Sequence, residues 1–271
     1  ELWNFNDPKG TEERFRAWLP ESGKQHDEVI SQIARCLGLQ GKFDEAEELL
    51  NTILDDWENA GERAKVSYFL EQGRLLNSSG DPKSAKPLFL NALEHAVTET
   101  DLKIDALHML GIVDSPNEAL KWNFQAIELA KTTPHPSGKR WLGSLLNNTA
   151  WTLHDTGRAK EALPLFEEAV KFREAQGDPG PILIAKYAVA RCKRTLGEYE
   201  TALKELFAIR GDGNDPYIEE EIGENLWALD MLEEAIPYLD RASHMFEADS
   251  YFMKVESQRL DSIKNRIRKF R

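Results

Sequence analysis

The sequence has little cysteine: Cys36 and Cys192 are the only two among 271 residues, and they stand far apart. There is no CxxC pair and no Cys/His ligand spacing, which excludes the usual zinc-binding patterns. We expect both thiols to be reduced inside the helices of a cytoplasmic protein. The six histidines also lack metal-ligand spacing. The sequence therefore predicts no metal site and no cofactor.

Long hydrophobic runs are missing too. The most apolar stretch, residues 182–190 (ILIAKYAVA), is short and contains a lysine, so we expect no membrane-spanning segment. The beginning of the sequence lacks the basic-then-apolar pattern of a signal peptide. Basic residues are outnumbered 34 to 47, and the net charge is −13. This charge argues against general nucleic-acid binding, because the phosphates would be repelled.

Sequence signatures of common enzymes are absent as well. No GxGxxG, Walker loop, HExxH or GxSxG occurs. Residues 212–215 (DGND) resemble part of a calcium loop, but Pro216 and the missing glycine and glutamate argue against one. We therefore expect a protein that is not an enzyme.

What the sequence does contain is an internal repeat. A glycine followed five residues later by an alanine occurs in four stretches, and two weaker copies keep the alanine without the glycine. Successive alanines are 33 to 43 residues apart, and a helical pattern precedes each copy. The six alanines are Ala46, Ala85, Ala119, Ala162, Ala202 and Ala235. The repeating unit is therefore predicted to be helix, tight turn, helix.

The residue types at the turn and at the helix contact suit such a unit. Glycine ends the first helix because it adopts the left-handed conformation at little cost. Small residues let the two helices approach closely, and large apolar residues fill the gap between successive pairs. The small residues are Ala34, Gly73, Ala150, Ala190 and Gly223, and the large ones are Leu50, Phe89, Phe166, Leu206 and Leu239. Copy three, with Asp114-Ser115-Pro116 at its turn, and copy six, with Asp230, are expected to be irregular.

These copies resemble the tetratricopeptide repeat family over nearly the whole chain. The shared features are the small residue of the first helix, the G-x-[YF]-x-x-A turn at 41–46 (GKFDEA) and 197–202 (GEYETA), and the large residue four positions later. Copies four and five are similar to the longer repeats of kinesin light chains, copy four through its LLNN and EALPLFEEAVKFRE stretches. The resemblance implies an all-α, right-handed α-solenoid of about six helix-turn-helix repeats with terminal capping helices.

We expect a single solenoid domain over residues 1–271. Residues 27–249 hold the six repeats. Residues 1–26 resemble a worn copy of the unit and are predicted to form a half-repeat or cap in which Phe15 and Trp18 are buried. Residues 250–271 match no other copy, and we expect them to form a capping helix whose basic run is solvated.

The resemblance also implies where a ligand binds. In tetratricopeptide arrays the first helix of each pair lines a concave groove, and residues at helical spacing point into it. The predicted groove residues are Asn147, Asn148, Trp151 and His154 in copy four, Tyr187, Arg191 and Arg194 in copy five, Arg74 in copy two and Glu220 in copy six. Further groove positions are Gln32 and Arg35 in copy one, Glu71 in copy two, Asp105 in copy three and Glu224 in copy six.

The chemistry of these side chains suits a peptide ligand. Peptide-binding members of the family have an asparagine at the position of Asn148, and its amide offers both a donor and an acceptor to a peptide backbone. The alternative is that the asparagines bond between neighbouring repeats and that Trp151 only packs. Likewise, Arg191 and Arg194 either meet an acidic ligand group or form ion pairs with groove glutamates.

We therefore predict a non-enzymatic scaffold that binds a protein or an extended peptide, with or without an acidic group, in its groove. We expect neither nucleic acid nor membrane as a partner, and the chain is predicted to be a monomer. Two alternatives stay open. One is an intracellular sensor of signalling peptides, similar to quorum-sensing regulators but without a DNA-binding domain of its own. The other is a self-assembling structural module.

Overall fold

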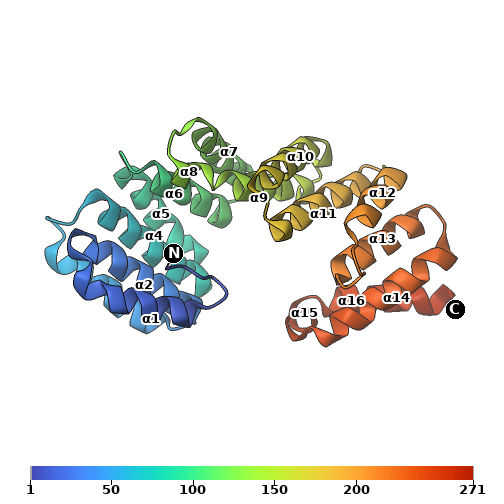
Figure 1. Ribbon diagram of the computed structural model, residues 1–271, viewed down its shortest axis with the longest axis horizontal. Coiled ribbons are helices and arrows are strands. Elements are labelled where there is room, and N and C mark those ends of the chain that lie inside the picture. Colours follow the sequence, from blue (N-terminus) through green and yellow to red (C-terminus); the bar gives the residue numbers. More distant parts are fainter. Residues whose placement is uncertain (1, 271) are drawn as a thin grey trace. The chain divides into compact units, whose positions relative to one another are not determined.

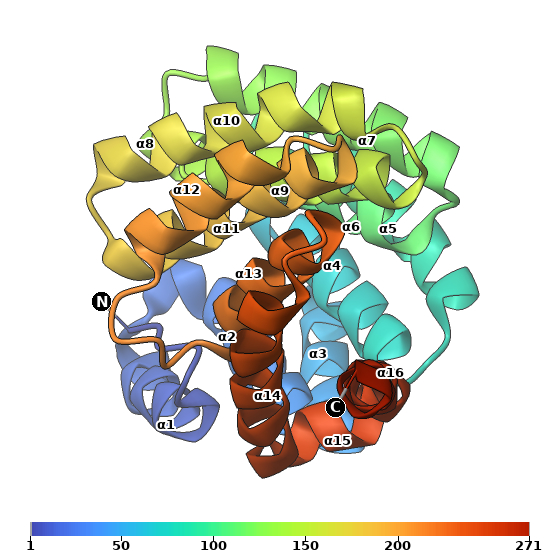
Figure 2. The same ribbon diagram turned by 90° about the vertical axis from the view of Figure 1, so that its right-hand side faces the viewer.

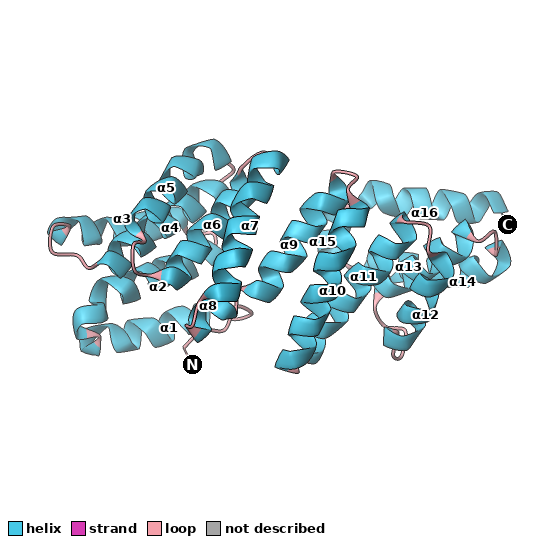
Figure 3. Ribbon diagram, turned by 90° about the horizontal axis from the view of Figure 1, so that it is seen from above, coloured by secondary structure: helices cyan, strands magenta, loops and turns pink. Residues whose placement is uncertain are grey.

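The computed structural model describes residues 2–270. Over this range the chain forms α-helices and short 3-10 helices joined by turns, and no β-strand (Figure 3). Across the same range no helix is long and apolar enough to cross a membrane. The chain divides into two compact units, Glu1–Leu145 (unit 1) and Leu146–Arg271 (unit 2). The predicted all-α fold is thus confirmed.

Unit 1 consists of successive helix hairpins. Its helices are α1 (Pro8–Trp18), η1 (Leu19–Glu21), η2 (Gly23–Gln25), α2 (His26–Leu39), α3 (Phe43–Asn51), η3 (Thr52–Asp56), α4 (Glu62–Ser78), α5 (Pro82–His95), α6 (Thr100–Val113), α7 (Pro116–Thr132) and α8 (Pro136–Lys139). α2 packs against α3, α4 against α5, and α6 against α7, while the first helices α2, α4 and α6 also contact their neighbours in this order (Figure 1). α1 packs on α2 and buries Phe15, whereas Trp18, also predicted to be buried, is only half-buried against the same core.

Unit 2 continues the same pattern. Its helices are α9 (Leu142–Asp155), which begins in unit 1, α10 (Ala159–Gln176), α11 (Pro179–Thr195), α12 (Tyr199–Ile209), α13 (Pro216–Ala228), α14 (Leu232–Ala248), α15 (Ser250–Val255) and α16 (Ser257–Phe270). α11 packs against α12, and α13 against α14. The segment expected to form one capping helix is two helices, α15 and α16, and both contact α14 (Figure 2).

The turns within the hairpins explain the glycine pattern. Gly157 and Gly197, which follow α9 and α11, have φ values of 78° and 82°, and the glycines of copies one and two are also left-handed. In copy six Asp230 takes this place with φ 61°, the only positive φ outside glycine among residues 2–270. In copy three Asp114 is extended instead. Copy six therefore keeps both the hairpin and its left-handed turn, whereas copy three keeps the hairpin and changes the turn.

Close helix contact within a hairpin requires the small residues. A Cβ added to Gly73 of α4 would lie 2.4 Å from the ring of Phe89 on α5, and one added to Gly223 of α13 would lie 2.6 Å from Leu239 on α14. Both large residues are fully buried. Since this contact fixes which side of each first helix faces its partner, it also fixes which side carries the predicted groove residues.

Candidate functional site

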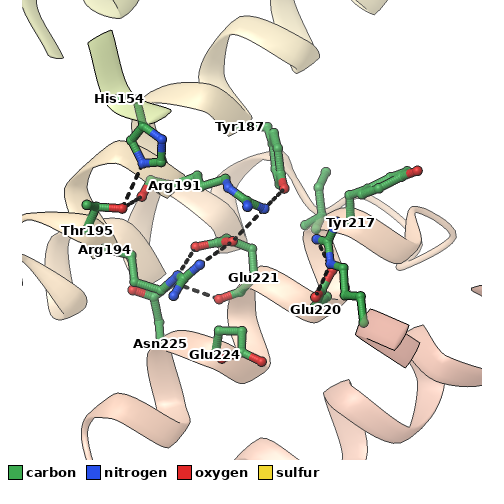
Figure 4. A network of polar contacts seen from close by, with 12 residues as sticks. His154, Tyr187, Arg191, Arg194, Thr195, Tyr217, Glu220, Glu221, Glu224 and Asn225 are labelled. Atoms are coloured by element: carbon green, nitrogen blue, oxygen red, sulfur yellow. Dashed lines mark hydrogen bonds and ion pairs between the residues drawn. The ribbon is translucent and has the colours of Figure 1, made fainter. Parts of the chain in front are cut away.

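Most of the predicted groove residues of unit 2 lie in one network. Trp151 and His154 come from α9, Tyr187, Arg191 and Arg194 from α11, and Glu220 from α13; Figure 4 shows all of these except the indole. Asn147 and Asn148 precede the tryptophan on α9, whereas Arg74 lies on α4 of unit 1. The structure thus brings together residues from copies four, five and six.

The half-buried indole of Trp151 is the apolar part of this site. It packs edge-on against Phe166 and His154, with ring centroids 5.0 and 5.2 Å apart. The guanidinium carbon of Arg191 lies 5.8 Å from its centroid, within the range of a cation–π contact. His154 Nε2 lies 2.8 Å from Thr195 Oγ1, which connects α9 to α11. Packing therefore fixes the indole while part of its surface stays in solvent.

The two asparagines offer hydrogen-bonding groups beside the indole. Asn147 Nδ2 donates to Asn148 Oδ1 at 3.3 Å, and both residues are half-buried. Asn147 Oδ1 is buried without a hydrogen-bond partner. The asparagines thus bond to each other along α9. Because Asn147 Oδ1 is closed to solvent, a ligand N–H group reaches it only if the side chain turns.

Arg191 and Arg194 share one carboxylate, that of Glu221 on α13. Arg194 binds it through Nε and through Nη2, which lies 3.3 Å from Oε2. Burial alone would lower the pKa of Arg194, but the charge of Glu221 outweighs this and raises it. Arg191 Nη1 is 3.8 Å from the same carboxylate, too far for a hydrogen bond. Arg194 is therefore fully paired with a groove glutamate, as the alternative interpretation expects, whereas Arg191 is only weakly paired.

Arg191 has spare donor capacity. Its Nη1 donates to Tyr187 Oη at 3.1 Å, whereas its Nε is buried without a partner. Burial raises the pKa of Tyr187, although the charge of Arg191 lowers it in part, so the hydroxyl stays protonated at neutral pH. Since the tyrosine oxygen accepts from Arg191, its own proton is available for another acceptor. The tyrosine hydroxyl and the exposed part of the Arg191 guanidinium therefore lie next to the indole, whereas Arg191 Nε is closed to solvent.

Two further glutamates of α13 are paired with arginines from α16. Arg259 Nε donates to Glu220 Oε1 at 2.8 Å, and Arg266 Nη1 donates to Glu224 Oε2 at 3.1 Å. We call these two pairs, together with Arg191, Arg194 and Glu221, the unit 2 network. It holds four arginines and three glutamates. In a chain of net charge −13, this network carries one excess positive charge.

Arg74 belongs to a different group of residues, the unit 1 cluster of Arg35, Glu71, Arg74 and Asp105. Arg74 binds Glu71 on its own helix and Asp105 on α6, and Arg35 Nη1 of α2 lies 3.5 Å from Glu71 Oε1. Burial would raise the pKa of Asp105, but the charges of Arg74 and Arg35 outweigh it and lower that pKa. Two cations face two anions here, so the cluster is electrically balanced.

Several residues of these sites were not predicted from the sequence. Glu221 lies in the run of glutamates 219–221, and only the fold shows which of them faces α11. Arg259 and Arg266 lie in the segment interpreted as a solvated cap, yet both pair with α13. Their spacing of seven residues, which places them on one side of a helix, was the available signal.

Unit 2 also contains a separate cavity of about 570 Å³ lined by α10, α11 and α12. Val189 and Ile209 line it together with two ion pairs, one of them Lys186–Glu174 at 2.7 Å. Helical periodicity places Lys186 and Val189 on a different side of α11 from Arg191. A ligand in this cavity would therefore not touch the unit 2 network.

Comparison with known proteins supports the repeat assignment. Residues 142–175 match the tetratricopeptide repeat family model. These residues span α9 and α10, the hairpin of copy four. No curated protein sequence matches the chain.

Solved structures share the fold. The apo form of RapI has a TM-score of 0.71 and 12% identity, covering 91% of this chain and 76% of its own. The apo form of the quorum sensor NprR from B. thuringiensis has a TM-score of 0.66 and 17% identity, and the match covers 91% of this chain and 73% of NprR. The nearly identical repeats of a putative kinesin light chain from Podosopora anserina have a TM-score of 0.56 and 18% identity. The match covers 69% of this chain and 94% of that structure. The predicted resemblance to tetratricopeptide repeat proteins, including those of the kinesin-light-chain type, is thus confirmed.

Proposed function

We propose that this protein is a non-enzymatic scaffold that binds an extended peptide, or an extended segment of a protein, on the surface formed by α9, α11 and α13. The observation that carries this proposal is the position of Arg191. Its guanidinium lies over Trp151, donates to Tyr187 and approaches Glu221 only to 3.8 Å, and the side chain is 28% exposed. A cation fixed in place but not fully paired, next to an apolar ring, suits an acidic group on an apolar ligand.

Each part of the surface has a role in this proposal. An apolar side chain of the ligand packs on the exposed part of Trp151, and its carboxylate accepts from Arg191 and Tyr187. The amides of Asn147 and Asn148 pair with the ligand backbone. The single excess positive charge of the unit 2 network attracts an acidic ligand to this place, whereas the chain as a whole, with its net charge of −13, repels it.

A peptide sensor is the second candidate, and one comparison favours it. A solved structure of NprR is a complex with its cognate peptide NprX; it has a TM-score of 0.55 and 15% identity, covering 95% of this chain and 78% of that one. A sensor and a scaffold use the same surface, but they differ in whether peptide binding changes the structure of the protein. In a sensor the peptide alters the helix packing, whereas in a scaffold the packing stays the same.

Our proposal also covers location and organisation. We place the protein in the cytoplasm because Cys36 and Cys192 are buried free thiols. Burial raises the pKa of these thiols to about 12 and about 11, respectively. We also propose that residues 27–249 are six repeats of one solenoid domain, and that residues 1–26 and 250–271 cap it.

The test uses an array of short extended peptides, each made with one aspartate and again with asparagine at that position. We expect the wild-type protein to prefer the aspartate forms and Arg191→Ala to lose this preference. Losing a charged hydrogen bond of about 1.5–3 kcal/mol corresponds to a loss of about 10- to 150-fold in affinity. Lys186→Ala is the matched control, because it removes a cation from another side of α11. Equal binding of both peptide forms by the wild-type protein would contradict the proposal.

A further inference from the structure

Residues 2–6 of unit 1 lie along the same side of α2 that carries the predicted groove residues of copy one. The indole nitrogen of Trp3 donates to Gln32 Oε1 at 2.9 Å. The guanidinium carbon of Arg35 lies 5.7 Å from the ring centroid of Trp3 and 5.8 Å from that of Phe5. An amide and an arginine of a first helix therefore hold two aromatic side chains of a non-helical segment.

The two rings act together because a turn brings them face to face. Asp7 N–H donates to the carbonyl of Asn4 at 3.1 Å, and Phe5 and Asn6 form the centre of this turn. Trp3 and Phe5 are stacked, with centroids 4.8 Å apart and ring planes at 16°. Trp3 also packs edge-on against Phe15 of α1 at 5.6 Å. The indole is half-buried, whereas Phe5 is 63% exposed. Another segment could therefore replace these residues on α2.

The backbone of the segment is held as well. Asn4 N–H donates to Thr11 Oγ1 at 3.0 Å, and Asn4 carbonyl accepts from the same hydroxyl at 3.0 Å. Arg14 Nε donates to the carbonyl of Leu2 at 2.9 Å. The side chains of the segment contact α2 and its backbone groups contact α1. The side chains can therefore give specificity while the backbone hydrogen bonds fix the position of the segment.

We propose that the surface of α2 at Gln32 and Arg35 is a second binding site, specific for a short non-helical segment whose two aromatic side chains stand two residues apart. In this structure the chain's own residues 2–6 occupy it. Gln32 and Arg35 hold groove positions equivalent to those of Asn148 and Arg191 in unit 2. The site therefore differs from the unit 2 surface in ligand, because it selects aromatic rings rather than an acidic group.

The test empties the site in the full chain with the double variant Trp3→Ala/Phe5→Ala and adds a labelled peptide of residues 2–6 (LWNFN). We expect the variant to bind this peptide in a saturable manner, and the wild-type protein to bind it at least about tenfold more weakly because its own segment competes. A peptide with alanine in place of both aromatic residues serves as the control and is expected not to bind. Adding Gln32→Ala/Arg35→Ala to the double variant should abolish the binding of LWNFN.

A second measurement covers the case in which the double variant folds poorly. Arg35→Ala in the otherwise wild-type chain should speed hydrogen exchange of the Asn4 amide while amides within α4 and α5 stay protected. If the folded double variant fails to bind LWNFN, or if Arg35→Ala leaves the Asn4 amide unchanged, the site is only a packing contact and the proposal is wrong. Arg191→Ala should not affect LWNFN binding, so the two proposed sites succeed or fail separately.

Discussion

The unit 1 cluster and the unit 2 network use the same chemistry with different charge balance. In both, arginines on first helices bind carboxylates on the next first helix. The unit 1 cluster matches two cations with two anions, and the side chain of its central Arg74 is 14% exposed. The unit 2 network has four cations for three anions, and Arg191 is 28% exposed with a long ion pair.

This difference separates a structural role from a binding role. Buried charges must be paired, because an unpaired one loses its hydration without compensation. A balanced cluster therefore has no capacity left for a ligand. A network with one cation in excess remains stable only when that cation keeps some contact with solvent, and this is the position of Arg191. The proposed ligand would take the place of that solvent.

The largest expected effect is at the centre of the unit 1 cluster. Arg74→Ala leaves the buried carboxylate of Asp105 without its bound arginine, and that of Glu71 with only the 3.5 Å contact to Arg35. We expect the free energy of unfolding to fall by about 3–5 kcal/mol, as for other broken buried ion pairs. Urea denaturation measures this change. A loss as small as that of Arg191→Ala would mean that the two regions do not differ.

A smaller effect is expected at the shared carboxylate of unit 2. Glu221→Gln removes the only anion bound by both Arg191 and Arg194, whose side chains are partly exposed. We expect a loss of about 1–3 kcal/mol in the free energy of unfolding, because solvent replaces part of the interaction. The same variant should bind acidic peptides more tightly than the wild type, since a competing carboxylate is gone. Weaker binding of these peptides would argue against the proposed role of Arg191.

Acidification should affect the two units in opposite directions. Burial, offset in part by Arg259, raises the pKa of Glu220, so the folded protein binds this proton at a higher pH than the unfolded chain, whose value is about 4.3. Between the folded and the unfolded pKa of Glu220, unit 2 therefore gains stability as the pH falls. Asp105 has a lowered pKa, so unit 1 keeps its contribution above about 3.9 and loses it as the pH falls through the lower folded value. Hydrogen exchange measured along the chain separates the response of unit 1 from that of unit 2. Glu220→Gln should remove the stabilisation of unit 2 at low pH and leave the response of unit 1 unchanged.

The smallest expected effect on stability is that of Arg191→Ala. Arg194 keeps Glu221 paired, so the variant loses a long ion pair and a cation–π contact with Trp151. We expect the free energy of unfolding to change by less than about 1 kcal/mol. Thermal melting by circular dichroism checks this. A large drop in melting temperature would show that Arg191 holds the helices together, as Arg74 does.

The repeating part of the fold could be predicted because its signals are local. A glycine at the left-handed turn and small residues at the helix contact are required wherever a hairpin closes, so they recur at fixed spacing. Copies six and three are the two that lack the glycine at this turn. Asp230 adopts the left-handed turn that glycine holds elsewhere, and Asp114 belongs to a different turn.

The candidate site could be predicted only where it belongs to a repeat. Helical spacing from the repeat placed Trp151 and Arg191 on the same side of neighbouring first helices, and the structure has them in contact. Arg259 and Arg266 come from α16, which matches no repeat, so no spacing related them to α13. Trp3 likewise lies in a segment without periodicity. Contacts between a repeat and a non-repeating segment depend on packing that the sequence pattern does not encode.

The two cysteines give each unit a chemical reporter of its own opening. Cys36 lies in unit 1 and Cys192 in unit 2, both fully buried. Burial raises the pKa of both thiols, which leaves almost no thiolate at neutral pH in the folded state. An alkylating reagent therefore reacts with each thiol only when the helices around it separate. The rates at the two positions, read by mass spectrometry on the unmodified sequence, give the opening frequency of each unit without any introduced label.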